Sequence, residues 1–290
     1  AMLLQLSLTD EPLYWVANCP DILVLPFILR RKPYILEYRS PWPVEIKREF
    51  GEGLLTEISR RMEKLALRNA KYITLTTSKL KERTTIKKPV FIIPNYPQTS
   101  FIAASKQAKK FIEKENPAGD KIVLFIGRLS TVEGADILPR IANELVKHER
   151  NISIWIVGDG PLLPALEKAL GNKSKVRFYG WQKRERIPLF IEASDVCIVP
   201  RHESRYSKYY NEEGLQKLSE YMFYKKPIVA CGIADSDQYK LVKESELVQG
   251  IMEALDGKAP TPMRRTWEEK SKPVLFELME TLITEYKNQV

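Results

Sequence analysis

Short apolar runs alternate with amphipathic stretches between residues 121 and 231, and this alternation is the clearest pattern in the chain. The apolar runs have the length of buried strands and occupy residues 122–126, 152–157, 176–178, 196–199 and 228–231. The stretches between them predict helices over residues 135–146, 161–170, 186–192 and from about residue 212 onwards. In the first of these, Leu138, Ile141, Ala142 and Leu145 have the i, i+3, i+4, i+7 spacing of a helix that packs on a sheet. Strands that alternate with helices predict a parallel, doubly wound α/β domain.

The N-terminal part of the chain has a weaker version of the same pattern. Residues 22–39 predict two short strands around a proline-initiated turn, and the prolines of residues 39–43 predict a break after them. Leu54, Ile58, Met62 and Leu65 then recur at near-helical spacing. Two further apolar runs, residues 72–76 and 90–93, read as strands. We therefore expect a second α/β sheet here.

Polar and proline-rich stretches divide the chain into candidate domains. Residues 104–120 are rich in Lys and Glu and end in Pro-Ala-Gly, a composition that suits a connector. Beyond residue 231 the pattern predicts a helix over 247–255, a proline-rich turn and a last helix over about 272–287. The predicted organisation is an N-terminal domain (1–105), a linker (106–120), a second domain (121–270) and a C-terminal helix (271–290).

Composition limits the location and the partners. The longest apolar run, residues 22–29, is far shorter than the roughly 20 residues of a membrane-spanning helix, so we expect a cytoplasmic protein. The net charge of +9 attracts polyanions: nucleic acid, an anionic membrane surface or phosphorylated substrates. The three cysteines, Cys19, Cys197 and Cys231, are widely spaced and support neither a disulfide framework nor a zinc site. Abundant Lys and Glu with only two His hint at a thermophile.

Ligands of parallel sheets bind outside the carboxyl ends of the strands, so the turns there are the first candidates for chemistry. Gly127-Arg128-Leu129 follows one strand, and its guanidinium can bind a phosphate or can be an ordinary surface group. Gly158-Asp159-Gly160-Pro161 follows the next strand. It can present helix N–H groups to an anion, or it can be only a tight turn.

Two glutamates mark the third candidate. Glu212 and Glu220 are eight residues apart, which on a helix is about 80° of rotation and ~12 Å of rise. Such a pair can accept hydrogen bonds from hydroxyl groups at two places on an elongated ligand, because carboxylates are strong acceptors. In the alternative reading, Glu212 and Glu213 only complement the helix dipole.

Several of these segments together resemble a known family. GRL followed by EGAD, then IVGDGP, VRFYGW, DVCIVP and KLSEYMFYKKPIVA, occur in the order and at the spacings of GT-B glycosyltransferases of the retaining family 4 group. The segments RSPWP (39–43), IPNYPQTSFI (93–102) and TWEEKSKPVLFELMETL (266–282) are also similar to elements of that family.

The resemblance implies two Rossmann-like domains that face a cleft, with a UDP- or GDP-sugar bound in it. Arg128 would contact the pyrophosphate, Glu220 the ribose, and Glu212 or Glu213 the sugar. The donor-binding residues implied are Gly127, Arg128, Gly158, Gly160, Gly180, Trp181, Arg201, Lys217, Leu218 and Glu220, with Arg39 and Trp42 on the acceptor side. No cofactor or metal is expected, because fixed cations and helix N-termini can neutralise the leaving diphosphate.

The chain departs from the family pattern at important places. Glu133 replaces the family's pyrophosphate-binding Lys, and Lys217, Arg201 or Lys183 can substitute for that Lys, or donor binding is weakened. The N-terminal domain is predicted to be shortened, without the family's glycine-rich loop, and Tyr38 and Arg39 stand where the family has a His.

The predicted function is therefore transfer of a sugar, with retention, to a glycan or lipid-linked acceptor. The alternative is a non-catalytic or partner-dependent glycosyltransferase-like subunit. The basic helix of residues 47–68 can bind the inner face of an anionic membrane or can simply face solvent. Nucleic-acid binding is not expected, because the sequence has no recognised nucleic-acid motif and its basic residues alternate with acidic ones.

Overall fold

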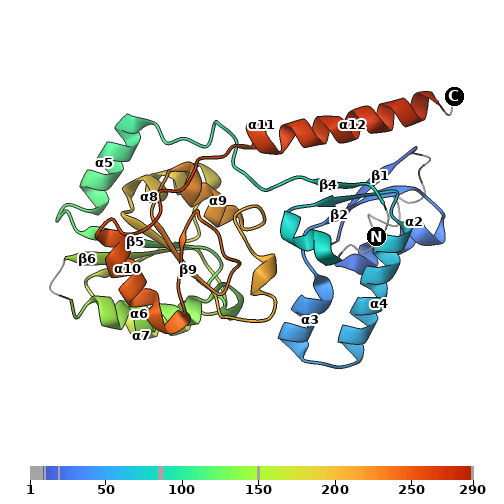
Figure 1. The fold of residues 1–290 in the computed structure, drawn as a ribbon. Helices are drawn as coiled ribbons and strands as arrows, with labels where there is room; N and C mark the ends of the chain where they lie inside the picture. Colours follow the sequence, from blue (N-terminus) through green and yellow to red (C-terminus); the bar gives the residue numbers. More distant parts are fainter. Residues whose placement is uncertain (1–8, 10, 19, 84–87, 149–150, 289–290) are drawn as a thin grey trace. The chain divides into compact units, whose positions relative to one another are not determined.

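A computed structural model describes residues 9, 11–18, 20–83, 88–148 and 151–288. The chain divides into two compact units, one formed by Ala1–Asn95 with Glu268–Val290 and the other by Tyr96–Trp267. Each unit contains a parallel sheet with helices packed on it (Figure 1). The predicted α/β architecture with two Rossmann-like units is confirmed.

The first unit has a parallel sheet whose described strands lie in the order β1-β2-β3-β4. They are β1 (Tyr14–Ala17), β2 (Tyr34–Tyr38), β3 (Tyr72–Leu75) and β4 (Val90–Ile92). Because every crossover advances in the same direction, right-handed connections put the intervening helices on one face. These helices are η1 (Asp21–Val24), α2 (Leu25–Leu29), α3 (Trp42–Phe50), α4 (Leu54–Asn69) and η2 (Ser78–Arg83).

The opposite face of this sheet is covered from the end of the chain. Helix α12 (Lys272–Lys287) follows α11 (Trp267–Lys270), and it buries Leu278 completely against Ile35 and Tyr72. An ion pair between Lys71 Nζ and Glu285 (2.7 Å) adds to the contact. The C-terminal helix is therefore part of the N-terminal unit.

The predicted strand over residues 22–29 is wrong, because η1 and α2 occupy this stretch. Pro26 lies in the first turn of α2, where a helix loses no hydrogen bond to a missing N–H. Pro43 has the same position in α3, so the prolines of residues 39–43 begin a helix as well as ending β2. Strand β1, which the sequence pattern did not predict, supplies the edge of the sheet instead.

The long helix predicted after residue 50 is confirmed as α4, but its apolar stripe does not face the core. The side chains that α4 buries are Thr56, Ala66 and Leu67. Leu54 is 77% exposed and Ile58 is 45% exposed. Helical spacing groups residues on one face but does not state what covers that face.

The second unit has a six-stranded sheet with the order β10-β9-β8-β5-β6-β7. Its strands are β5 (Lys121–Ile126), β6 (Ile152–Val157), β7 (Val176–Gly180), β8 (Val196–Pro200), β9 (Ile228–Cys231) and β10 (Lys240–Leu241). Strands β6 and β7 are added on one side of β5, and β8, β9 and β10 are then added on the other side of β5. The order of the strands therefore reverses between β5 and β8, and ligands of such sheets bind at this switch point.

Helices cover both faces of the second sheet. They are α5 (Ser105–Glu115), η3 (Thr131–Glu133), η4 (Ala135–Ile137), α6 (Leu138–Leu145), α7 (Leu163–Leu170), η5 (Arg184–Arg186), α8 (Ile187–Ala193), η6 (Ser207–Tyr209), α9 (Gln216–Phe223), η7 (Glu244–Glu246) and α10 (Leu247–Leu255). Figure 1 shows α6 and α7 on one side of the sheet and α5 and α8 on the other. Alternate residues of β5 accordingly enter two separate core clusters.

The structure differs from the predicted linker over residues 106–120, because most of that stretch is helix α5. The ring of Phe111 packs edge-on against Phe190 of α8, with the ring centroids 4.9 Å apart. Phe111 also contacts Trp155 of β6. The many lysines of this stretch lie on the exposed face of an amphipathic helix.

A close backbone approach joins the loop after β5 to the end of β8. Gly134 has φ +72°, and a Cβ at this position would lie 1.6 Å from the carbonyl oxygen of Pro200. Only glycine fits such a conformation and such a contact. The two loops on either side of the switch point are therefore held together by their main chains.

Replacing Gly134 with Ala should destabilise the protein by about 2–4 kcal/mol, because it adds a steric clash to the cost of the left-handed conformation. Denaturant unfolding would measure the loss. Gly119→Ala is the matched control, since Gly119 has φ +66° with open space around its Cβ position. Its expected cost is only about 1 kcal/mol. Equal losses in the two variants would contradict the packing role of Gly134.

Candidate functional site

The turns after β5 and β6 pack against each other at the carboxyl ends of their strands. The N–H of Leu129 donates to the carbonyl of Asp159 (2.9 Å). A Cβ on Gly158 would lie 1.9 Å from the carbonyl oxygen of Gly127, and one on Gly160 would lie 2.5 Å from that of Leu129. The structure thus brings Gly127, Gly158 and Gly160 together. The close main-chain contacts by themselves explain why positions 158 and 160 need glycine.

A largely buried cluster of three charges lies beside the Gly127 turn. Glu133 Oε1 accepts a hydrogen bond from Arg201 Nη1 (2.7 Å), and Glu133 Oε2 is 2.6 Å from Lys217 Nζ. The three residues come from η3, from the loop after β8 and from α9. Lys217 Nζ is only 3.2 Å from the position that a Cβ on Gly127 would occupy. The reversed charge at position 133 is therefore compensated by two cations from distant parts of the chain.

Electrostatics keep this cluster ionised. Burial by itself would raise the pKa of Glu133, but attraction to Lys217 and Arg201 outweighs burial and lowers the pKa to about 2. Burial lowers the pKa of Lys217, and Glu133 opposes that shift. Lys217 Nζ and Glu133 Oε2 are only 2.6 Å apart, and this short ion pair keeps both groups charged. The guanidinium of Arg201 also stacks on the ring of Tyr210, 4.4 Å from its centroid. The cluster has a net charge of +1.

Arg128 adds an accessible cation to this cluster. Its side chain is exposed, and within the described part of the chain it forms no hydrogen bond or ion pair. Arg128 directly follows Gly127, the residue that Lys217 Nζ approaches, so its guanidinium is suited to bind a diphosphate at this turn.

The first pair of predicted carboxylates lies in a turn and not on a helix. Helix α9 begins at Gln216, so Glu212 and Glu213 precede it. Glu212 is buried, and its Oε1 accepts a hydrogen bond from Ser236 Oγ (3.4 Å) and lies 3.7 Å from Arg265 Nη1. Its Oε2 is buried and has no hydrogen-bond partner among the described residues. Glu212 therefore offers an unused acceptor, whereas the more exposed Glu213 contacts Asn211.

Glu220 lies on α9 and is 3% exposed. Burial raises its pKa, although Arg184 Nη1 donates a hydrogen bond to its Oε1 and opposes this shift. The guanidinium of Arg184 stacks on Phe101, 4.5 Å from the ring centroid. Leu218, on the same helix, is fully buried in the core and has no side-chain surface for a ligand.

The sequence of this unit matches a known family. Residues 120–256 match the family model described as Glycosyl transferases group 1. The second unit is therefore similar in sequence to group 1 glycosyltransferases. A stretch of 189 aligned residues is 26% identical to an alpha-D-kanosaminyltransferase from Streptomyces kanamyceticus. The match covers 62% of this chain and 47% of that protein. This chain thus spans about half the length of that curated relative.

Solved glycosyltransferase structures have the same GT-B fold. Sucrose-phosphate synthase from Thermosynechococcus elongatus aligns with 99% of this chain and 77% of its own, with a TM-score of 0.75 and 17% identity. The HepE protein of Anabaena, solved in complex with UDP and glucose, aligns with 98% of this chain and 80% of its own, with a TM-score of 0.70 and 17% identity.

The remaining predicted residues are divided between the two units. Gly180 has φ +60° at the end of β7 in the second unit, and the Trp181 side chain beside it is 70% exposed. Arg39 and Trp42 belong to the first unit. Arg39 Nε donates to Glu37 (2.7 Å), and the buried Nε1 of Trp42 has no hydrogen-bond partner among the described residues.

Sequence reasoning missed the residues that hold the glutamates in place. Arg184, which binds Glu220, lies in a run of basic residues, and Ser236 and Arg265 lie in loops that reach Glu212. None of them belongs to a motif, so the sequence contained no signal for these contacts.

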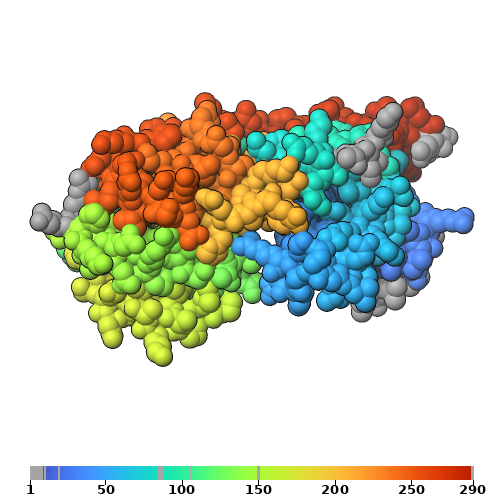
Figure 2. All heavy atoms as spheres, turned by 60° about the horizontal axis from the view of Figure 1, so that its bottom comes forward, coloured from blue at the N-terminus to red at the C-terminus, as the bar shows by residue number. Residues whose placement is uncertain are grey.

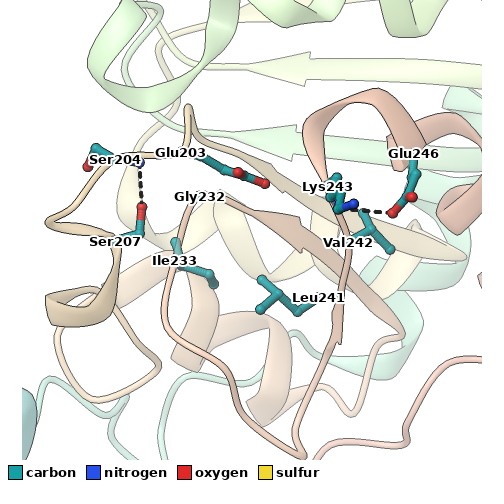
Figure 3. Close-up of a pocket in the computed structure, with 9 residues that line it drawn as sticks. All are labelled: Glu203, Ser204, Ser207, Gly232, Ile233, Leu241, Val242, Lys243 and Glu246. Carbon is teal, nitrogen blue, oxygen red and sulfur yellow. Dashed lines mark hydrogen bonds between the residues drawn. The ribbon is translucent and has the colours of Figure 1, made fainter.

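A cavity of about 460 Å³ lies beyond the charged cluster, at the carboxyl ends of β9 and β10 (Figure 3). It is lined by Glu203, Ser204, Ser207, Gly232, Ile233, Leu241, Val242, Lys243 and Glu246. None of these is a predicted donor-binding residue. The described residues contain no group of three or more His, Cys, Asp or Glu side chains placed to bind a metal. Cys197 and Cys231 are buried and unpaired, and Cys19 lies outside the described residues.

Replacing Glu133 with Gln should destabilise the second unit by roughly 3–5 kcal/mol, because it leaves two largely buried cations without their counter-ion. Thermal and denaturant unfolding would measure this loss. The double variant E133Q/K217Q should recover part of it, since one of the stranded charges is removed. A double variant less stable than E133Q would contradict the compensation.

The same variant predicts a change in acid stability. The pKa of Glu133 falls from 4.5 to about 2 on folding, so its contribution is fully present above pH 4.5 and is lost as the pH falls toward 2. We expect the stability of the wild type to fall more steeply than that of E133Q across this interval.

Proposed function

We propose that this chain transfers a sugar from a nucleotide-diphosphate sugar to an acceptor, with retention at the anomeric carbon. The supporting observation is the set of three cations, Arg128, Arg201 and Lys217, at the strand ends of a unit similar in sequence to group 1 glycosyltransferases. The leaving nucleotide diphosphate gains negative charge as the glycosidic bond breaks, and fixed positive groups stabilise that charge.

The cations have different parts in this proposal. Arg128 is exposed and free to bind phosphate oxygens through two parallel N–H donors. Lys217 and Arg201 are buried with Glu133, so they act mainly through the net positive charge that they place beneath the Gly127 turn. No cofactor or metal enters the proposal.

The carboxylates would bind the hydroxyl groups of the donor. Glu220 is proposed to accept from the ribose through the oxygen that Arg184 does not bind. Glu212 is proposed to accept from the transferred sugar through its unused Oε2. Trp181, with its exposed indole, would border the base.

The donor and the acceptor are proposed from similarity to other glycosyltransferases, and only as classes of molecule. Since a structural neighbour, HepE, was solved with UDP and glucose, we propose UDP-sugars first and GDP-sugars second. The acceptor would be a glycan or a lipid-linked glycan.

The second candidate function is that of a glycosyltransferase-like subunit which needs a partner chain. Glu133 supports this candidate. It stands where the resembled family has a pyrophosphate-binding Lys, and its negative charge cancels that of one of the two neighbouring cations. Nucleotide binding without sugar transfer or donor hydrolysis, with activity restored by a co-purified partner, would favour this candidate.

Arg128→Gln should weaken UDP binding by about tenfold or more, the value of a lost hydrogen bond between charged groups, and should leave the stability unchanged. Calorimetry with UDP and with uridine separates the diphosphate from the base, and only UDP binding should change. Lys168→Gln, which removes one exposed charge from α7, is the matched control. If no nucleotide binds to the wild type, the proposal is wrong.

We also propose that the first unit associates with the inner face of an anionic membrane. No helix in the described part of the chain is long and apolar enough to span a membrane. The support lies around the α3–α4 turn, where Phe50 and Leu54 are 64% and 77% exposed beside Lys47 and Arg60. Both basic side chains are bonded to Glu52, so the apolar groups would contribute most of the affinity.

The double variant L54S/I58S should lower binding to anionic vesicles about tenfold, since two exposed apolar side chains would no longer enter the lipid. Vesicle co-sedimentation measures this, with zwitterionic vesicles for comparison. Met279→Ser removes a 45% exposed apolar side chain from α12 of the same unit and should have no effect. Equal binding by all three proteins would exclude the α3–α4 turn as the membrane site.

A further inference from the structure

His202 lies between two carboxylates in the loop that follows β8. Its Nδ1 is 2.9 Å from Glu244 Oε2, and its Nε2 is 2.8 Å from Asp136 Oδ2. Asp136 lies in η4, in the loop region after β5, and Glu244 begins η7, after β10. One imidazole ring therefore links three segments that are far apart in the sequence.

This geometry requires a protonated ring. A neutral imidazole has one N–H donor and one bare nitrogen, whereas an ionised carboxylate can only accept. With a carboxylate at hydrogen-bond distance from each nitrogen, both nitrogens must donate, and the ring is an imidazolium. The side chains of the three residues are each about one-third exposed, so solvent protons reach the contact.

We call the contacts of His202 with Asp136 and Glu244 the clamp. The other charged groups around it are consistent with a protonated ring. Arg140 of α6 donates to the main-chain carbonyl of Glu244 (2.6 Å) and lies 3.5 Å from its carboxylate, so it holds Glu244 in place. Partial burial lowers the pKa of His202, but the bonds to Asp136 and Glu244 outweigh burial and raise it above its ordinary value of 6.5.

The clamp holds the loop after β8 directly beside Arg201, one of the cations that bind Glu133. His202 directly follows Arg201, and the carbonyl of Arg201 accepts a hydrogen bond from Cys231 Sγ (3.1 Å). On its other side, Glu203 and Ser204 line the cavity at the ends of β9 and β10 (Figure 3). The loop itself lies at the surface of this unit, in the golden-orange part of the colour bar (Figure 2).

We infer that His202 is a positioning residue, which as an imidazolium ties the loop bearing Arg201 to η4 and η7 and so sets the place of the buried cations beside the diphosphate. The diphosphate part of this inference rests on the proposed function. Because the bound state of the ring is the protonated one, the clamp is closed at pH values below about 6.5 and opens as the pH rises through the raised pKa of His202.

Ring titration by nuclear magnetic resonance tests the clamp directly. The chain has only two histidines, so His148→Gln assigns the two ring signals. The His202 ring should titrate above 6.5, with both nitrogens protonated in the acid form, and Asp136→Asn and Glu244→Gln should each lower its midpoint. A midpoint at or below 6.5, or one that neither substitution changes, would overturn the inference without reference to any ligand.

The positioning role is tested by UDP affinity from about pH 6 to about pH 9, the range in which a perturbed His titrates. Relative to His202→Gln, the wild type should bind UDP about two- to fivefold more tightly at the acid end, the size expected of partly exposed ion pairs, and equally at the alkaline end. The ratio of the two affinities cancels the ionisation of UDP itself. His148→Gln is the matched control and should retain the wild-type profile.

A ratio that stays constant with pH would overturn the positioning role. Absence of UDP binding in all three proteins would count against the proposed function and the positioning role together, while the ring titration still decides the clamp. If His202→Gln does not fold, the wild-type titration and the carboxylate variants retain the test.

Discussion

The ion pairs of Glu133 with Arg201 and Lys217 are the interaction on which the site depends. A carboxylate that is only 22% exposed is costly without partners, and two largely buried cations are costly without a carboxylate. Each charge therefore requires the other two, and η3, the loop after β8 and α9 must meet at the same place. That place is the switch point between β5 and β8, where an open parallel sheet can bind a ligand.

Main-chain contacts make this meeting point rigid. Gly134 touches the end of β8, and Gly158 and Gly160 touch the turn that bears Arg128. None of these contacts leaves space for a side chain, so the loops after β5, β6 and β8 have few alternative arrangements. The clamp formed by His202 also links these loops. In contrast to the main-chain contacts, this link depends on protonation of the ring. A charged cluster held by main-chain contacts, with one contact that depends on protonation, is the physical basis of the proposed pH dependence.

The second unit could be predicted well because its central strands, β5, β6, β8 and β9, are almost entirely buried and its helices have a single apolar stripe. The first unit was harder. Residues 22–29 form a continuous apolar run, which has no period that separates a buried strand from a buried helix, and the structure has a helix there. Leu54 and Ile58 have helical spacing, yet the structure leaves them exposed. The many lysines of residues 106–114 led to the prediction of a linker, although Phe111 of α5 packs in the core.

By itself, the sequence determined the alternation of strands and helices, the turns at the strand ends and the order of motifs that resembles glycosyltransferases. These are local properties, set by residues within one or two turns of each other. Only the tertiary structure decided how the charge at position 133 is compensated, because Arg201 is 68 residues away and comes near only through the order of the strands. It also decided that Arg184 binds Glu220, and that Glu212 Oε2 has no hydrogen-bond partner among the residues that the structure describes. The strength and direction of a charge interaction depend on distance and burial, and neither can be read from spacing along the chain.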